Sequence, residues 1–155
     1  MLRITSLVLA SIVCLGPAAV IAQDKTAPAY DAALATSLGA DERGMRSYVL
    51  VVLKTGPTRV PDGEKRTEMF AGHMANIQRL ADEGKLVFAG PLDGVDGWRG
   101  IFIFATPDIA TATTYVATDP VIVNGEMVAE YHQLYGSAGL MMMNEVSRRI
   151  SKQSR

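Results

Sequence analysis

Residues 71–91 restrict the fold more than any other stretch of the chain. They read AGHMANIQRLADEGKLVFAGP, in which apolar residues first recur at helical spacing. Gly84 then predicts the end of a helix, because glycine adopts the left-handed conformation without steric cost. Residues 86–89 are expected to form a short strand, and Gly90-Pro91 to form a turn. We therefore expect the helix to lie against the sheet that this strand joins.

The neighbouring segments complete an alternating order of strands and helices. β-Branched and aromatic residues predict further strands at 47–54, 98–105 and 127–135. Helices are predicted at 64–83 and from residue 106 to about residue 118. The order β-α-β-β-α-β is typical of a ferredoxin-like α+β fold. In this two-layer sandwich, two helices cover one face of a four-stranded sheet, and the first and third strands are central.

Polar residues and prolines predict where the two helices begin and end. Asp62 is expected to cap the first helix, because a carboxylate accepts hydrogen bonds from free backbone N–H groups. Thr106 is expected to cap the second helix, with Pro107 in its first turn. Pro120 should force Asp119 out of helical geometry and end that helix.

The central strands indicate that something covers the second face of the sheet. Residues 48–53 and 101–104 are apolar on both faces, whereas a strand with one wet face alternates apolar and polar residues. Several exposed Val, Leu and Phe side chains are costly at roughly 25 cal/mol per Å². A second copy of the chain is the simplest cover, so we expect a homodimer formed through this sheet face.

The N-terminal residues 1–22 are typical of a signal peptide. They combine a basic start, an apolar run and small residues at the end of Val20-Ile21-Ala22, which predicts cleavage after Ala22. The alternative is an uncleaved membrane anchor, but Gly16-Pro17 interrupts the apolar run. We expect a periplasmic or secreted protein without stable membrane insertion after cleavage.

The mature chain divides into three segments. Residues 23–45 are interpreted as a linker or a loosely docked segment, which suits their Ala-rich, weakly patterned sequence. Residues 46–136 form the predicted sandwich domain. Residues 137–155 form a C-terminal extension with a short helix predicted at 142–150 and a basic end.

Charge and residue counts exclude several classes of function. The chain has 155 residues and a net charge of −1, so it lacks the basic excess that nucleic-acid binding calls for. A single cysteine, Cys14, falls inside the predicted signal peptide and excludes a disulfide framework. The two histidines, His73 and His132, lack an acidic third ligand. We expect no metal and no cofactor.

Several of these features together resemble the YCII-related (YciI-like) domain family. The resemblance rests on residues 48–54, His73, residues 86–91 and the Asp119-Pro120 pair, and it covers roughly residues 46–135. It implies a dimeric α+β barrel and a site made of one helix histidine and one aspartate. A dehydrochlorinase of the lyase type and isomerase-like barrels among the relatives imply acid–base chemistry. The family often ends its last strand in a Pro-aromatic pair, but Leu134-Tyr135 stands here.

The resemblance places the family histidine at His73. The aspartate corresponds best to Asp119, with Asp93 as a second candidate. His73 lies between Phe70 and Ile77 on the apolar face of its helix, where a neutral imidazole beside a carboxylate suits general base chemistry. The other interpretation is a core histidine whose nitrogens bond to backbone groups.

Three further residues are candidates for substrate binding. Arg99 has the planar guanidinium that suits a small carboxylate. Trp98, beside it, either stacks on a ligand or covers the edge of the core, and His132 lies on the predicted last strand.

Two functions follow from these residues. One is a small enzyme in which His73 transfers a proton, with Asp119 orienting it, during elimination or isomerisation of a small organic molecule. The other is a non-catalytic homodimer with a binding or structural role, which needs only the fold and the apolar sheet face.

Overall fold

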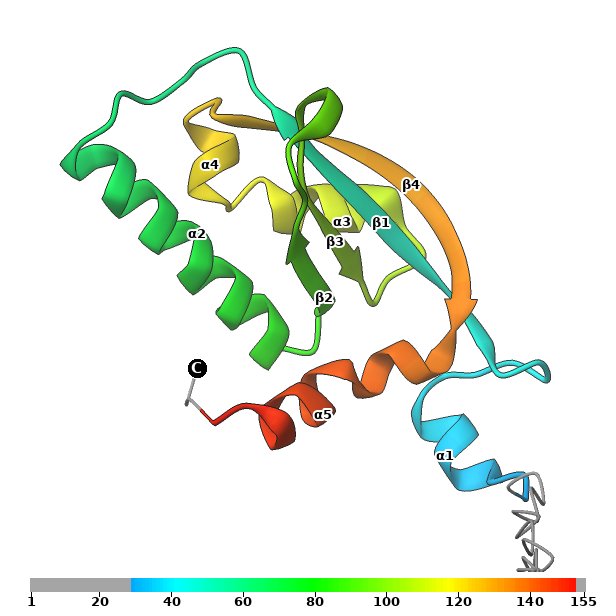
Figure 1. Cartoon of the computed structure of the whole chain (residues 1–155). Helices are drawn as coiled ribbons and strands as arrows, with labels where there is room; N and C mark the ends of the chain where they lie inside the picture. Colours follow the sequence, from blue (N-terminus) through cyan, green and yellow to red (C-terminus); the bar gives the residue numbers. More distant parts are fainter. Residues whose placement is uncertain (1–28, 153–155) are drawn as a thin grey trace, which may run out of the picture. The chain divides into compact units, whose positions relative to one another are not determined.

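A computed structural model describes residues 29–152 (Figure 1). The predicted signal peptide and its cleavage after Ala22 lie outside these residues. None of the helices between residues 29 and 152 combines the length and the apolar character that crossing a membrane demands.

The elements follow the predicted order, and the C-terminal helix forms close to its predicted range of 142–150; a further short helix precedes the last strand. The elements are α1 (Ala32–Ser37), β1 (Met45–Thr55), α2 (Glu64–Asp82), β2 (Leu86–Pro91), the 3₁₀ turn η1 (Val95–Gly97), β3 (Trp98–Phe104), α3 (Ile109–Val116), α4 (Pro120–Val123), β4 (Met127–Ser137), the 3₁₀ turn η2 (Ala138–Met142) and α5 (Met143–Ile150).

The four strands form one antiparallel sheet in the order β2-β3-β1-β4. The first and third strands are therefore central, as the sequence predicts. Between residues 29 and 152, five helices and a four-stranded antiparallel sheet make this an α+β protein, consistent with a ferredoxin-like fold.

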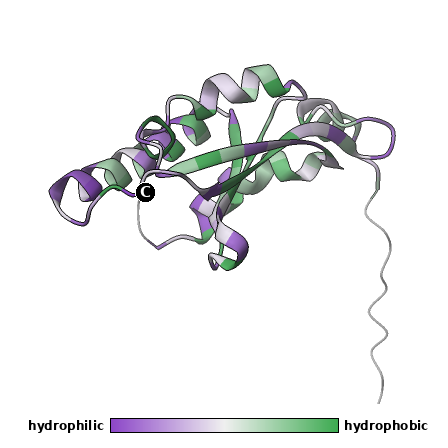
Figure 2. Ribbon diagram, turned by 90° about the horizontal axis from the view of Figure 1, so that it is seen from above, coloured by the Kyte–Doolittle hydropathy of each residue, from purple (hydrophilic) through white to green (hydrophobic). Residues whose placement is uncertain are grey.

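The core lies on the face of the sheet that the helices cover. Val49, Val51 and Leu53 of β1 point to this face, and the register places Phe104, Phe102 and Gly100 of β3 opposite them. The helices α2, α3 and α4 contribute the other buried side chains of the cluster, among them Met69, Leu80, Ala112, Val116 and Val121. Figure 2 shows hydrophobic residues on the strands, with hydrophilic stretches between them.

The helix-to-strand transition after α2 forms as predicted. Gly84 has a φ of 68°, its N–H donates to the Ala81 carbonyl, and the Lys85 N–H donates to the Leu80 carbonyl at 2.9 Å. These bonds satisfy carbonyls at the end of the helix and turn the chain directly into β2.

Both predicted helix caps are wrong. The N-cap residue of α2 is Gly63, which has no side chain to cap the helix, and Asp62 pairs with Arg59 and Arg66 instead. The cap of α3 is Asp108, which accepts from the Thr111 N–H at 2.8 Å. Thr106 instead accepts a hydrogen bond from the Asp108 N–H at 3.1 Å, so the helix begins later than predicted.

Pro120 ends one helix and begins another. Asp119 has extended geometry (φ −81°, ψ 124°) and separates α3 from α4, as expected for a residue before proline. Proline also suits the first position of a helix, since its φ is already helical and it needs no N–H partner there. The short helix α4 was not predicted, and it makes Asp119 its N-cap residue.

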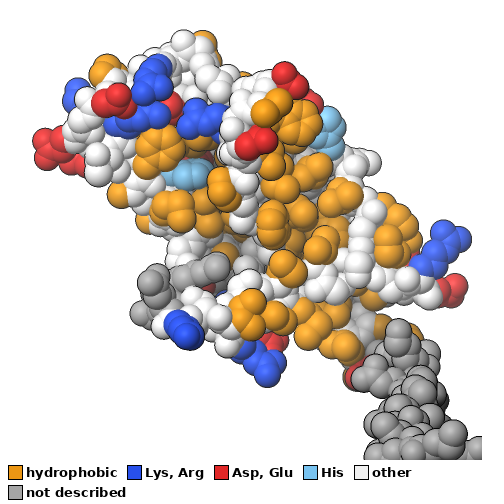
Figure 3. All heavy atoms as spheres, viewed as in Figure 1, with side chains coloured by type: hydrophobic (Ala, Val, Ile, Leu, Met, Phe, Trp, Pro, Cys, Tyr) orange, Lys and Arg blue, Asp and Glu red, His pale blue; other side chains and the backbone are white. Residues whose placement is uncertain are grey.

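The other face of the sheet, which we call the open face, is covered only in part by this chain. Tyr48 lies on it and is fully buried, because the segment that includes η2 packs there and the Ser137 carbonyl accepts from its hydroxyl at 2.9 Å. Leu50, Ile101 and Ile103 lie further along this face and stay partly exposed. Figure 3 shows a broad patch of hydrophobic side chains over the strands.

The segments before and after the sandwich are both attached to it. Arg46 of β1 donates to the Leu38 carbonyl at the end of α1 at 2.8 Å. Tyr135 of β4 donates to Asp41. Asn144 of α5 donates to the Leu86 carbonyl at 2.7 Å.

Candidate functional site

His73 projects from α2 toward the sheet. Its ring stacks on Phe102 of β3, with the centroids 6.0 Å apart and the planes inclined by 29°. Phe70, one turn earlier on α2, meets the ring edge-to-face at 6.2 Å. Two aromatic contacts of this kind fix the plane of the imidazole.

Asp119 contacts His73. The sequence suggests the two residues as a pair, but it does not show that their side chains meet. Nδ1 of His73 lies 2.8 Å from Oδ2 and 3.0 Å from Oδ1 of Asp119. The carboxylate is fully buried. Its Oδ1 also accepts the N–H of Val121 at 3.1 Å, as the N-cap of α4. The same side chain therefore holds a helix end and a histidine ring.

Gly72 explains how the two elements come so close. A Cβ atom at this position would lie 3.0 Å from Cγ of Pro120, which is too close for an ordinary contact. Glycine thus lets α2 approach the start of α4, which brings His73 to Asp119. Sequence reasoning missed this residue, although a glycine inside a helix is a recognised sign of close packing.

Asn76 supports the carboxylate from one turn below His73. Its Oδ1 accepts from Nη2 of Arg79 at 2.7 Å and from Oγ1 of Thr118 at 3.0 Å. The amide NH₂ group is thereby turned toward Oδ2 of Asp119, 3.5 Å away. Asn76 is buried and was also missed; its position three residues after His73, on the same side of the helix, is the signal for it.

The contact with Asp119 determines which nitrogen of His73 is free to react. A carboxylate can only accept, so Nδ1 of the neutral ring carries the proton and Nε2 presents a lone pair. The described residues provide no hydrogen-bond partner for Nε2. Nε2 is also not buried, because Arg46 Nε is the one buried side-chain nitrogen or oxygen without a partner among these residues. Nε2 is therefore part of the 12% of this side chain that is exposed.

Arg66 and Arg99 converge on a buried carboxylate near this histidine. Nη2 of Arg66 lies 2.7 Å from Oε1 of Glu126, and Nη1 of Arg99 lies 3.9 Å from the same oxygen. Glu126 is only 3% exposed and also accepts the Val60 N–H. The hydrogen bond from Arg66 holds the pKa of Glu126 below its ordinary value of 4.5, with smaller lowering by Val60 and Arg99 against the opposing effect of burial.

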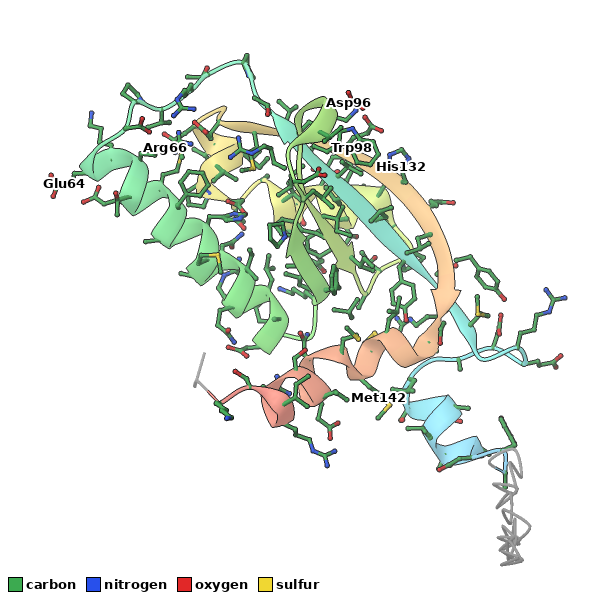
Figure 4. All side chains as sticks on the ribbon, in the orientation of Figure 1. Glu64, Arg66, Asp96, Trp98, His132 and Met142 are labelled. Carbon is green, nitrogen blue, oxygen red and sulfur yellow. The ribbon has the colours of Figure 1, made fainter. Side chains whose placement is uncertain are left out.

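The structure places the remaining predicted site residues away from His73. His132 pairs with Glu130 at 2.8 Å, and the Trp98 ring lies 5.8 Å from the Lys54 ammonium; these residues lie on the open face and its edge (Figure 4). Asp93 accepts the Val95 N–H at 3.1 Å within its own loop. Of the substrate-binding candidates, Arg99 is the one connected to the His73 side through Glu126 and Arg66.

A shallow hollow of about 510 Å³ lies elsewhere, between the end of α2 and α5. Its lining includes Asp82, Asn144 and Arg148, and it contains neither His73 nor Asp119. Within residues 29–152, three or more His, Cys, Asp or Glu side chains do not gather in a way that would hold a metal ion.

Comparisons with known proteins bear on the family more than on the reaction. One solved structure similar to this chain is 5-chloro-2-hydroxyhydroquinone dehydrochlorinase from Burkholderia phenoliruptrix in complex with 2,5-dihydroxybenzoquinone. It is 20% identical, covers 54% of this chain and 90% of its own, and has a TM-score of 0.39, which is too low to bear on activity. The curated proteins contain no match. The model of the YCII-related domain matches residues 45–133. That match covers more than half of the chain, which therefore belongs to the YCII-related domain family.

Proposed function

We propose that this protein catalyses proton transfer on a small organic molecule, with His73 as the base. The observation that carries this proposal is the orientation of one ring: Nδ1 is held by a buried carboxylate, while Nε2 has no partner among residues 29–152. A neutral imidazole that presents one free nitrogen is suited to accept a proton near neutral pH.

In the proposed step, Nε2 takes a proton from a carbon next to an electron-withdrawing group. In an elimination, the C–H electron pair forms a double bond and a leaving group departs with its own electron pair. In an isomerisation, the proton returns to a different carbon. Asp119 stabilises the imidazolium that forms, because its buried negative charge lies 2.8 Å from Nδ1.

A homodimer through the open face forms part of the proposal. Leu50, Ile101 and Ile103 leave apolar surface on this face that a second copy would bury. Export to the periplasm or beyond the cell, suggested by residues 1–22, completes it. Sedimentation that gives a monomer at micromolar concentration would contradict the dimer.

A non-catalytic homodimer is the second candidate function. The apolar open face favours it, since that surface calls for a partner whether or not His73 reacts.

Proton–deuterium exchange tests the catalytic proposal without knowledge of the natural substrate. The mature protein is incubated in D₂O with a panel of small carbon acids, and loss of each C–H signal is followed by ¹H NMR. We expect exchange to fall by about 10²-fold or more in His73→Gln, a typical share for a general base. His132→Gln is the matched control and should exchange like the wild type. Equal exchange by His73→Gln and wild type would exclude His73 as the base.

A further inference from the structure

The charges around Glu126 do not cancel. Arg66 and Arg99 face the Glu126 carboxylate, and Arg66 also lies 3.4 Å from Asp62, which Arg59 pairs with at the surface. These three arginines and two carboxylates leave one positive charge in excess. Arg66 makes the short contact, while Arg99 remains 3.9 Å away and its guanidinium forms no hydrogen bond to any described residue. The Arg99 side chain is 30% exposed, so its donors are open to a ligand.

Phe70 connects this cationic group with His73. The guanidinium carbon of Arg66 lies 5.0 Å from the centre of the Phe70 ring, and the His73 ring lies 6.2 Å from it. Arg66, Phe70 and His73 are spaced at i, i+4 and i+7, so they share one side of α2. Phe70 is only partly buried and presents apolar surface between the cation and the base.

The spacing limits the size of the molecule that both groups can contact. Seven residues of helix rise by roughly 10 Å, and the Arg66 and His73 side chains both lean onto the same intervening ring. A flat molecule lying along Phe70 can therefore touch a guanidinium at one end and Nε2 at the other. Figure 4 labels Arg66 on α2, and Figure 3 shows basic side chains next to hydrophobic surface at this end of the helix.

We propose that the substrate is a planar carboxylate with an apolar, unsaturated body. Its carboxylate would bind Arg99, beside the Arg66 guanidinium that Glu126, Asp62 and the Val60 carbonyl hold in place, its body would cover Phe70, and its acidic C–H would face Nε2 of His73. A single excess positive charge matches a monoanion, whereas a dianionic phosphate would be repelled by Glu126. Planar guanidinium groups bind carboxylates with two parallel hydrogen bonds, which also fixes the orientation of the body. This assignment of a substrate class rests on the proposed proton transfer by His73.

Binding of benzoate tests this proposal directly. The full mature protein is labelled at histidine, and the His73 ring signals are followed by NMR during titration with benzoate, benzamide and acetate; His132 is the internal reference. We expect benzoate to shift His73 saturably, and benzamide and acetate to bind at least 10-fold more weakly, because each lacks either the charge or the ring. Equal affinity for benzoate and benzamide would overturn the carboxylate assignment.

Variants of arginine locate the anion. Arg99→Gln should weaken benzoate about 10-fold, and Arg99→Lys should weaken it less, because lysine keeps the charge without the planar fork. Arg149→Gln is the matched control, an exposed arginine of α5 that lies 4.0 Å from Glu145, and should bind like the wild type. Unchanged affinity in Arg99→Gln, with a thermal melt like that of the wild type, would overturn the role of Arg99.

The outcome for binding is separate from the outcome for proton transfer. Benzoate that binds with the predicted dependence on Arg99, without exchange of any carbon acid, supports the anion site and overturns the catalytic role. Exchange that depends on His73, without binding of benzoate, supports the catalytic role and overturns the substrate class.

Discussion

The protein contains two histidine–carboxylate pairs with the same separation and very different surroundings. Nδ1 of His73 lies 2.8 Å from Asp119, and Nε2 of His132 lies 2.8 Å from Glu130. The first pair is 12% and 0% exposed, whereas the second is 48% and 45% exposed. Distance alone therefore does not distinguish a candidate reactive site from a solvated surface pair.

Burial and additional donors make the difference. Asp119 also holds the Val121 N–H and faces Asn76, so its position is fixed by groups from two helices. Glu130 also forms an ion pair with Lys54 at the surface, where water competes for every contact. A hydrogen bond inside the protein is electrostatically stronger than the same bond in water, which is why only the first pair is expected to hold one tautomer.

Replacing the two carboxylates should give the largest contrast. Asp119→Ala removes a helix cap and leaves Nδ1 of His73 unpaired, which we expect to cost about 3 kcal/mol of unfolding free energy. Glu130→Ala should leave the unfolding free energy unchanged within error, because exposed ion pairs contribute little. Urea denaturation of both variants measures the difference. Equal losses would mean that burial of Asp119 has no energetic consequence.

Asp119→Asn should separate the structural role of this residue from its chemical role. The amide oxygen can still cap α4, but its NH₂ group faces a ring nitrogen that must then accept, so the proton moves to Nε2. We expect ¹⁵N NMR to show this change of tautomer, and C–H exchange to fall about 10²-fold as the free base is lost. Glu130→Gln, the equivalent change at the exposed pair, should alter neither. Retention of the Nδ1–H tautomer in Asp119→Asn would contradict this account.

The dependence of stability on pH extends the contrast to two glutamates. The pKa of Glu126 is lowered mainly by Arg66, and that of Glu130 mainly by Lys54 and then by His132, in each case from 4.5. A depressed pKa gives stability that is present above about pH 4.5 and is lost as pH falls through the folded-state value.

Glu126→Gln should therefore remove part of the stability that the wild type has at pH 7 and lacks at pH 3. We expect a loss of about 1.5–3 kcal/mol at pH 7, the usual range for a hydrogen bond to a charged group. Glu130→Gln should leave the loss of stability between pH 7 and pH 3 almost unchanged, because solvent screens the pair. Urea denaturation at both pH values measures this. If Glu126→Gln lost as much stability between pH 7 and pH 3 as the wild type, that result would contradict a stabilising Arg66–Glu126 pair.

Gly72→Ala should have the smallest effect on stability and a specific effect on the buried pair. Alanine favours the helix by about 1 kcal/mol, and the contact with Pro120 opposes this gain. The net change should stay within about 1 kcal/mol, while the Nδ1–H signal of His73 moves because α2 is pushed from α4. Ala71→Gly, at an exposed position of the same helix, should cost about 1 kcal/mol without moving that signal. A His73 signal unchanged by Gly72→Ala would remove Gly72 from the positioning of the site.

The sequence predicted most of the fold because local signals and the global topology agree. Gly84 fixed the passage from α2 to β2, and the doubly apolar strands identified the centre of the sheet. The predicted helix starts were wrong because several residues able to cap a helix lie close together in the sequence. Asp62 and Thr106 both have the chemistry of a cap, but each is taken by another partner in the folded chain.

The candidate site was predictable in its residues and not in its geometry. His73 and Asp119 are 46 positions apart, and no periodicity relates a helix face to the residue before a proline on another helix. The His132–Glu130 pair is the opposite case. The two residues are two positions apart on one strand, so alternation alone places them on the same face. Residues 130 and 132 meet for a local reason, whereas residues 73 and 119 meet only through the packing of α2 against α4.

Sequence patterns alone specify the order of elements, the central strands and the residue types able to transfer a proton. Those properties depend on backbone preferences and on the period of apolar residues, which neighbouring positions encode. The packing of distant elements determines which histidine is buried beside a carboxylate and that Arg99 joins Arg66 at Glu126. It also leaves Nε2 of His73 without a partner in the part of the chain that the structure describes. Burial and close approach depend on elements far apart in the chain packing together, as Gly72 and Pro120 do.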